Sequence, residues 1–303
     1  MFHVLALIFI ALWAVCLGAA SDTLFTLLLV NAAVQVVWFM LVAVIPTLRT
    51  GRMSWVDIAW PFGVFFIGVA AFFLGDGDWI RRAAVGGVYA FIGLRMGIGA
   101  IAMGLKTGVI FKTEFPRYRY RAMKLDKAGV THPRLHMAVE VLLQGLANAS
   151  ILALPGFLIA TRDASSVSGL ELLGLALWAV AYALESVADA QKLLFISRDS
   201  GTGVCDVGLW RYSRHPNYFA EWLVWTGLVI AAIPSWWALR GSEPTLVWLA
   251  LGLGTVSASA MMYTTLVYLT GAVPAEHYSV QKRPGYRAYQ QRTNRFFPWF
   301  PRS

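Results

Sequence analysis

The stretch that decides the fold is Gly208-Leu-Trp-Arg-Tyr-Ser-Arg-His-Pro-Asn-Tyr-Phe-Ala-Glu221, which lies between two long apolar segments. The charged or polar side chains within its last eleven positions include Arg211, Arg214, His215, Asn217, Tyr218 and Glu221. The first half reads as a basic loop, and Pro216 suits the first position of a helix. Because polar groups are costly inside lipid, such a cluster at the entrance of a membrane helix is a candidate functional site.

The composition around this stretch is that of a membrane protein. Of the 303 residues, 58% are hydrophobic and only 14% are charged, whereas a soluble domain has about 25% charged residues. The net charge of +9 is explained by basic loops that orient a membrane protein, so no nucleic-acid partner is expected. Cys16 and Cys205 make neither a disulfide framework nor a metal-binding pattern, so no metal is expected.

Apolar runs of about 18 residues or more are candidate membrane spans. The sequence has eight such runs, at 2–20, 24–46, 55–74, 80–105, 136–160, 169–191, 216–239 and 245–271. The first run lacks the basic start of a signal peptide, which favours an extra helix over 1–20 that is retained. We therefore predict an all-α, polytopic bundle of seven to eight spans, which forms one integral membrane domain over 1–303.

The Lys and Arg residues are distributed unequally between the two sides of the membrane. With eight spans, twenty of the 25 Lys and Arg residues fall in loops and a tail on one side of the membrane. The positive-inside rule then places both termini in the cytoplasm. The segment 106–135 carries eight of these residues, and we expect it either to lie on anionic headgroups or to contact an anionic ligand. The tail 272–303 is expected to pack on the mouth of the site.

Polar residues inside the spans gather near the cytoplasmic ends. Asp57 begins one span, Glu185 and Asp189 share a helix face near the end of another, and Asn217 and Glu221 share a face at the start of a third. A single such residue is commonly satisfied by a neighbouring helix. Several at one depth indicate a polar cavity in the inner half of the bundle, because buried charges in lipid must pair or face water.

The charge around the cavity indicates the type of ligand. Arg211, Arg214 and tail arginines surround its mouth, and Arg forms bidentate contacts with phosphate. The helix that begins at Pro216 also directs its N-terminus there, which favours anions. A dinucleotide or adenosyl cofactor would fit, with an apolar co-substrate that arrives from the lipid.

Several motifs resemble the steroid 5α-reductase superfamily, in particular its large, poorly characterised bacterial branch. They include Ser54-Trp-Val-Asp-Ile-Ala-Trp60, Glu185-Ser-Val-Ala-Asp-Ala-Gln191, the block that ends at Glu221, and Lys282-Arg-Pro-Gly-Tyr-Arg-Ala-Tyr-Gln-Gln-Arg-Thr293. The likeness extends from about residue 30 to the end. It implies a multi-pass enzyme of the bacterial inner membrane that uses NADPH to reduce a carbon–carbon double bond conjugated to a ketone, in a steroid-like or other lipid substrate.

The resemblance also assigns roles to residues. Asn217 and Glu221 match the pair that contacts the nicotinamide half, and Arg214 and His215 would lie by the phosphates or ribose. The remaining cofactor candidates are Arg211, Tyr218, Glu185, Asp189, Tyr278 and Arg283.

The catalytic candidates under this resemblance are Asp57 and Tyr89, which occupy places comparable to the Glu and Tyr that hold the substrate ketone. A protonated carboxyl group that is hydrogen-bonded to Tyr would polarise the carbonyl while hydride reaches the β-carbon. Asp in place of Glu is a departure, because it is one methylene shorter, and this leaves the substrate class open.

Two alternatives remain at this stage. Isoprenylcysteine carboxyl methyltransferases and phospholipid methyltransferases carry a similar Arg-His-Pro-x-Tyr block, which binds S-adenosylmethionine. They tend to place an Arg-x-Glu-Glu pair after the last hairpin, where this chain has only Ala275-Glu-His277, and this favours the reductase. A transporter or assembly factor would instead spread polar residues over the full membrane depth.

Overall fold

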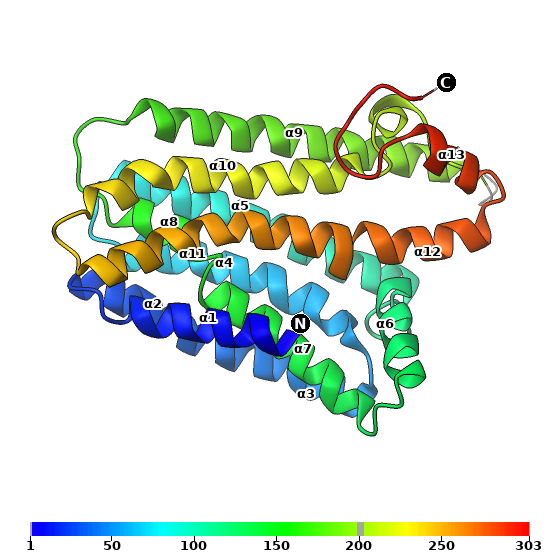
Figure 1. Cartoon of the computed structure of the whole chain (residues 1–303), viewed down its shortest axis with the longest axis horizontal. Coiled ribbons are helices and arrows are strands. Elements are labelled where there is room, and N and C mark those ends of the chain that lie inside the picture. Colours follow the sequence, from blue (N-terminus) through cyan, green and yellow to red (C-terminus); the bar gives the residue numbers. More distant parts are fainter. Residues whose placement is uncertain (1, 199–202, 303) are drawn as a thin grey trace. The chain divides into compact units, whose positions relative to one another are not determined.

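The computed structural model describes residues 2–198 and 203–302, which form helices joined by loops and contain no β-strand. Figure 1 labels the helices along the chain, from blue at the N-terminus to red at the C-terminus. The chain divides into two compact units. Unit 1 comprises Met1–Glu171 and Ala231–Ala258, and unit 2 comprises Leu172–Ile230 and Ser259–Ser303.

Unit 1 contains the first eight α-helices. They are α1 (Phe2–Cys16), α2 (Asp22–Phe39), α3 (Ile45–Thr50), α4 (Val56–Leu74), α5 (Trp79–Thr107), α6 (Pro116–Lys127), α7 (Pro133–Ala149) and α8 (Leu154–Ala160). A π-helical segment, η1 (Met40–Val44), joins α2 to α3, and a short 3₁₀ turn, η2 (Met53–Trp55), leads into α4.

Unit 2 contains most of α9 (Gly169–Arg198) and all of the elements around the 208–221 stretch. These are the 3₁₀ turn η3 (Gly208–Arg211), the π-helical segment η4 (Thr265–Leu269), α12 (Ala272–Lys282) and α13 (Tyr286–Arg292). Two further helices, α10 (Pro216–Ala238) and α11 (Thr245–Thr264), are divided, with 216–230 and 259–264 in unit 2.

Seven helical stretches of the described chain are long and apolar enough to cross a membrane. They are Asp22–Thr50, Met53–Leu74, Trp79–Thr107, Pro133–Ala160, Gly169–Arg198, Pro216–Ala238 and Thr245–Lys282, and Leu7–Cys16 is a shorter apolar helix. The prediction of an all-α polytopic bundle with seven to eight spans is confirmed, and the protein is a multi-pass membrane protein. The last stretch runs beyond the predicted end at 271, because α12 follows η4 after only a bend at Thr270 and Gly271.

A network of buried amide side chains connects α2, α4 and α7 within unit 1. Asn31, Gln35 and Asn148 are each at most 1% exposed. Gln35 Nε2 donates to Asn31 Oδ1 at 3.1 Å and to the Gly63 carbonyl at 2.8 Å, and Asn148 Nδ2 donates to the Trp60 carbonyl at 3.1 Å. Hydrogen bonds of this kind hold helices together where the hydrophobic effect between them is weak.

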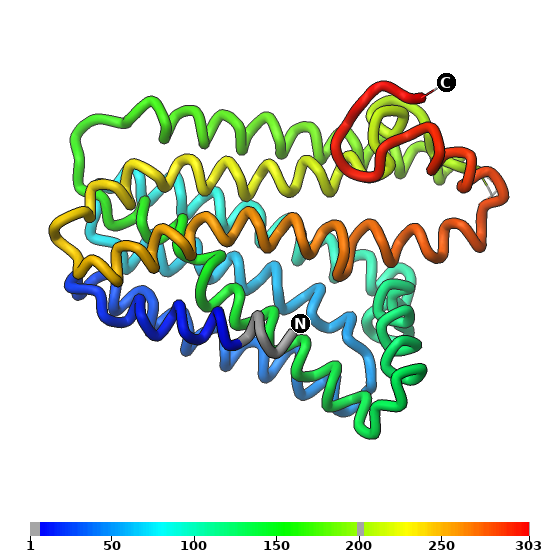
Figure 2. The backbone as a smooth tube through the Cα atoms, in the orientation of Figure 1, coloured from blue at the N-terminus to red at the C-terminus, as the bar shows by residue number. Residues whose placement is uncertain are grey.

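The predicted span 136–160 is not one continuous helix. Residues 150–153 interrupt it between α7 and α8, and Figure 2 traces the chain through this break. Two side chains satisfy backbone carbonyl groups there: the Tyr89 hydroxyl donates to Leu152 at 2.7 Å, and Ser150 Oγ donates to Leu146 at 2.6 Å. A break at this depth is tolerated because it is buried in protein, where the freed groups find partners.

The amide network generates the first prediction. A methyl group at Gly63 would overlap the amide groups of Asn148 and Gln35, which cannot move without losing their hydrogen bonds. Gly63→Ala should therefore destabilise the protein by about 1–3 kcal/mol, as overpacking typically does. The midpoint of thermal unfolding in detergent measures the change.

Gly87→Ala is the matched control, because Gly87 is also helical but a methyl group there meets no atom within 4 Å. Its midpoint should stay the same or rise slightly, since Ala is the better helix former. Equal midpoints for the two variants would show that the buried amides do not constrain Gly63.

Candidate functional site

The loop that precedes α10 is fixed to α9 inside unit 2. Gly208 has a positive φ of 55°, and a side chain there would collide with the amide of Gln191. That amide oxygen accepts the backbone N–H of Leu209 at 2.9 Å, and Trp210 Nε1 donates to the Ala188 carbonyl at 2.9 Å. A glycine is needed at this position both for the backbone conformation and for the close approach of Gln191.

Arg214 joins the 208–221 stretch to the C-terminal tail. Its Nε lies 2.7 Å from Glu276 Oε1 and its Nη2 lies 3.2 Å from Oε2, a two-point contact. Its Nη1 donates to the carbonyl groups of Gln290, at 2.9 Å, and Thr293. The backbone N–H of Arg214 donates to Asn294 at 2.9 Å. Both charged side chains are almost fully buried, so this ion pair is structural.

Further hydrogen bonds fix the tail on the same loop. Ser213 Oγ donates to the Phe296 carbonyl at 2.9 Å, and the Tyr289 hydroxyl donates to the Trp210 carbonyl. Burial raises the pKa of Tyr289, so the hydroxyl remains a donor. Figure 2 shows the red C-terminal residues curling back beside the yellow-green loop.

Glu276 is the residue of this site that the sequence reasoning missed. The sequence draws attention to Glu276 only within Ala275-Glu-His277, which differs from the methyltransferase pattern. In the structure its carboxylate accepts hydrogen bonds from Arg214 and from Gln290 Nε2, the latter at 2.8 Å. The available signal was a single carboxylate in a strongly basic tail, which has to find a cation when it is buried.

His215 is buried between the same carboxylate and a tyrosine ring. Its Nε2 lies 3.3 Å from Glu276 Oε1, and its ring stacks on Tyr218 with centroids 5.2 Å apart and planes 3° from parallel. Burial lowers the pKa of His215, although the hydrogen bond and the charge of Glu276 oppose this. His215 and Tyr218, predicted to lie near a cofactor, thus form one stacked pair at the start of α10.

Asn217 contacts the carboxylate-bearing face of α9. Its Nδ2 donates to Asp189 Oδ1 at 3.1 Å. Its Oδ1 is buried and has no hydrogen-bond partner within residues 2–198 and 203–302. Glu221 lies one turn further along α10, and Glu185, 8% exposed, lies one turn before Asp189. Figure 1 shows α9 and α10 side by side, and the structure therefore brings two helices with the predicted polar residues together.

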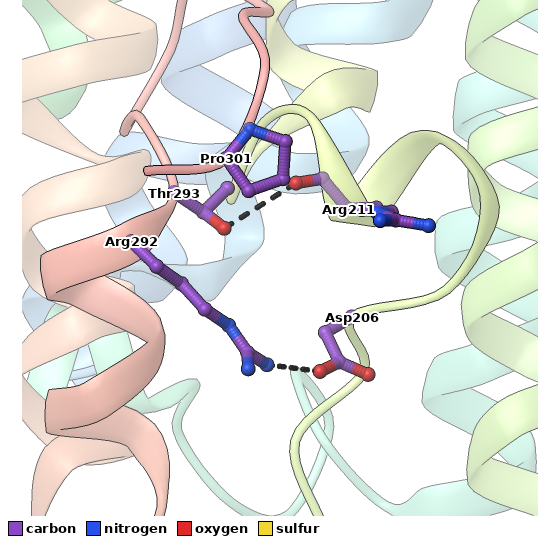
Figure 3. Close-up of a pocket in the computed structure, with 5 residues that line it drawn as sticks. All are labelled: Asp206, Arg211, Arg292, Thr293 and Pro301. Atoms are coloured by element: carbon purple, nitrogen blue, oxygen red, sulfur yellow. Dashed lines mark hydrogen bonds and ion pairs between the residues drawn. The ribbon is translucent and has the colours of Figure 1, made fainter. Parts of the chain in front are cut away.

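The other predicted cofactor residues lie on the loop and the tail. Arg283 Nη1 donates to Ser279 Oγ at 3.2 Å, and the Tyr278 ring packs edge-on against His277. Arg211 is exposed and helps to line a cavity of about 320 Å³ (Figure 3). Among the residues that the structure describes, the lining is Asp206, Arg211, Arg292, Thr293 and Pro301.

The two catalytic candidates lie in unit 1 and have different hydrogen-bond partners. Asp57 Oδ1 accepts from Arg117 Nη2 at 2.6 Å and from the Tyr118 hydroxyl at 3.1 Å, while Tyr89 donates to Leu152. Asp57 Oδ2 is buried and has no hydrogen-bond partner in the part of the chain that the structure describes. Burial and the charge of Asp57 raise the pKa of Tyr118, which keeps its hydroxyl a donor.

Two arginines of the basic segment 106–135 form ion pairs with carboxylates of unit 1. Besides the Arg117–Asp57 pair, Arg121 Nε lies 2.9 Å from both carboxylate oxygens of Glu140, which is 5% exposed. These two side chains are thus paired within the protein, and the expectation that the segment contacts headgroups or an anionic ligand stays a prediction. The partner carboxylates lie 60 and 19 positions away in the sequence, where no local pattern reveals them.

The buried ion pair of unit 2 generates the second prediction. Arg214→Gln leaves the buried Glu276 without its main counter-charge, which should cost about 3 kcal/mol of unfolding free energy. The Asp206–Arg292 ion pair is the matched comparison, because both of its side chains are more than a third exposed. Asp206→Asn should cost about 1 kcal/mol or less. Thermal unfolding in detergent measures both, and equal losses would mean that Arg214 does not fix the tail.

Comparison with known proteins identifies a family. Residues 38–293 match the family described as "Protein of unknown function (DUF1295)". The uncharacterised protein C594.04c of Schizosaccharomyces pombe is 35% identical over 99 residues, which are 32% of this chain and 24% of that protein. The matched stretch thus spans about a quarter of the yeast protein. No solved structure matches. Because the family match extends over most of the chain, the protein belongs to the DUF1295 family.

Proposed function

We propose that the protein is a membrane-embedded reductase that uses NADPH to reduce a carbon–carbon double bond conjugated to a ketone, in a steroid-like or other lipid substrate. The proposal includes the wider relationship to the steroid 5α-reductase superfamily that the motifs imply. It also includes a location in the bacterial inner membrane with both termini in the cytoplasm, as the distribution of Lys and Arg implies.

The observation that carries the proposal is the state of the Asn217 side chain. The hydrogen bond to Asp189 fixes which end of the amide is the nitrogen. The amide oxygen is left buried without a hydrogen-bond partner among the described residues. A buried unsatisfied acceptor costs about 1–3 kcal/mol, which a ligand that donates there recovers. The carboxamide N–H group of a nicotinamide ring is such a donor.

The contacts of Arg214 and Glu276 revise the division of roles within the proposed site. The Arg214 guanidinium is used by the tail, so we assign it to positioning the start of α10 and not to holding a phosphate. Glu276 then belongs to the site as the partner of Arg214. Asn217 and Glu221, on the α10 turns that follow, remain the residues proposed to contact the nicotinamide.

The chain's own residues have separate tasks in the proposed reaction. NADPH, when bound, supplies the hydride that reaches the β-carbon, and a proton completes the reduction at the α-carbon. Asn217 would orient the reactive ring. In unit 1, Asp57 is held by Arg117 and Tyr118 with one buried oxygen still unsatisfied, and this oxygen would meet a polar group of the substrate.

Cofactor titration tests the proposal. Purified protein in detergent should bind NADPH, and Asn217→Ala should weaken this binding by about tenfold or more, because a hydrogen bond from a desolvated partner is lost. Glu221→Gln should weaken it as well. NADPH fluorescence measures the binding. The control is Thr226→Val, because Thr226 lies further along α10. This variant should bind NADPH as tightly as the unaltered protein.

The alternative cofactor is the outcome that would contradict the proposal. Binding of S-adenosylmethionine together with no binding of NADPH would identify the protein as a methyltransferase that acts on a lipid or prenylated substrate. Cofactor that co-purifies with the protein, identified by mass spectrometry, gives an independent answer.

The candidates in unit 1 should affect turnover without affecting cofactor binding. Asp57→Asn and Tyr89→Phe keep the shape of the side chain but change its hydrogen bonding. Each should lower the rate of NADPH oxidation with an enone lipid by about 10²-fold or more, as the loss of a group in acid–base chemistry does. Normal turnover in both variants would remove Asp57 and Tyr89 from the active site.

A further inference from the structure

A second polar feature of unit 2 is the cavity of about 320 Å³ (Figure 3). Its volume lies at the lower end of the range for small-molecule sites, about 300–1,000 Å³. Three segments form its walls: the loop from Asp206 to η3, the C-terminal end of α13, and Pro301 near the end of the chain. The cavity is partly open to solvent.

The walls of the cavity are fixed relative to one another by hydrogen bonds. Thr293 Oγ1 donates to the Arg211 carbonyl at 3.3 Å, which ties α13 to η3. The backbone N–H of Arg302 donates to the Arg292 carbonyl at 2.8 Å, which ties the end of the chain to α13. A site whose backbone is already in place loses less entropy when a ligand binds.

The arginines of this region differ in how far their hydrogen-bonding groups are used. Arg214 is buried and donates to four acceptors of the tail. Arg292 is paired through Nη2 with Asp206 and stays about half exposed. The Arg211 side chain has no hydrogen bond or ion pair within the described chain. Arg211 and Arg292 thus retain unused guanidinium donors and both line the cavity. Figure 3 shows Arg292 directed toward Asp206, while the exposed Arg211 side chain extends away from it and would turn to meet a ligand bound at Arg292.

The lining combines two cations with one carboxylate. A phosphate group can accept two parallel hydrogen bonds from each guanidinium group. Asp206 would repel a lone phosphate, but its carboxylate accepts a hydrogen bond from a hydroxyl group. The lining therefore matches a ligand in which a phosphate monoester and a hydroxyl group are neighbours, as on a phosphorylated sugar.

We propose that this cavity binds a phosphate monoester that lies next to a hydroxyl group, with Arg211 and Arg292 on the phosphate and Asp206 on the hydroxyl. If the proposed function holds, the ligand is the phosphorylated ribose of NADPH, and the cavity is what distinguishes NADPH from NADH. The headgroup of phosphatidic acid carries the phosphate monoester without the neighbouring hydroxyl group, and the experiment separates this lipid from the cofactor.

The test compares the affinity of full-length protein in detergent for NADPH and for NADH. Arg211→Gln and Arg292→Gln should each weaken NADPH binding by about tenfold or more, the effect of losing a charge-assisted hydrogen bond. NADH binding should change by less than about twofold, since NADH lacks the phosphate. Arg287→Gln is the control, because Arg287 is exposed on the same helix but does not line the cavity.

A second measurement uses native mass spectrometry to count phosphatidic acid and phosphatidylcholine molecules on the same variants. Loss of phosphatidic acid binding with unchanged NADPH binding supports the phosphate contacts of Arg211 and Arg292, assigns them to a lipid and overturns the hydroxyl contact of Asp206. Equal effects on NADPH and NADH, no effect on any ligand, or the same effect in Arg287→Gln overturns the proposal. If the unaltered protein binds neither dinucleotide, the proposed function fails. The binding of phosphatidic acid to the variants then tests by itself whether the cavity binds a phosphate group.

Discussion

The arrangement of unit 2 depends on one buried ion pair, between Arg214 at the start of α10 and Glu276 on α12. Desolvating two charges is expensive, and the attraction between them compensates only when the geometry is good and the remaining donors are satisfied. Here the guanidinium group meets both carboxylate oxygens and two backbone carbonyl groups. The pair therefore fixes the register of the tail against the loop, and with it the positions of His215 and Asn217.

A second constraint acts in unit 1, where lipid offers backbone groups no partner. The break between α7 and α8 frees carbonyl groups, and Tyr89 supplies a hydrogen bond at 2.7 Å to one of them. This structural task accounts for the burial of Tyr89, and the catalytic role proposed for its hydroxyl group would come in addition to it. A hydroxyl group already committed to the backbone would have to change partner to reach a substrate, whereas Asp57 keeps a buried oxygen available.

Much of the fold could be predicted from the sequence, because membrane spans are set by long apolar runs that are local in the chain. The i, i+4 spacing also predicted that Asn217 and Glu221 share a face. The pairings could not be predicted. Arg117 meets Asp57 across 60 positions and Arg214 meets Glu276 across 62, and only folding decides which of many charges become neighbours. The helix break at 150–153 was missed although the sequence carries a signal for it, because Pro155 lacks an N–H group and its ring clashes with the carbonyl four residues before it.

The burial of each arginine distinguishes those that stabilise the fold from those that can bind a ligand. A guanidinium group whose donors are all used cannot bind a ligand without first giving up contacts that hold the fold together. By this criterion Arg214 is structural, although it lies in a basic stretch that suggests anion binding. Arg211 and Arg292 retain unused donors and can bind an anion at little structural cost. Basic sequence alone therefore overstates the number of ligand-binding residues, and the hydrogen-bond partners of each arginine decide which of them are available.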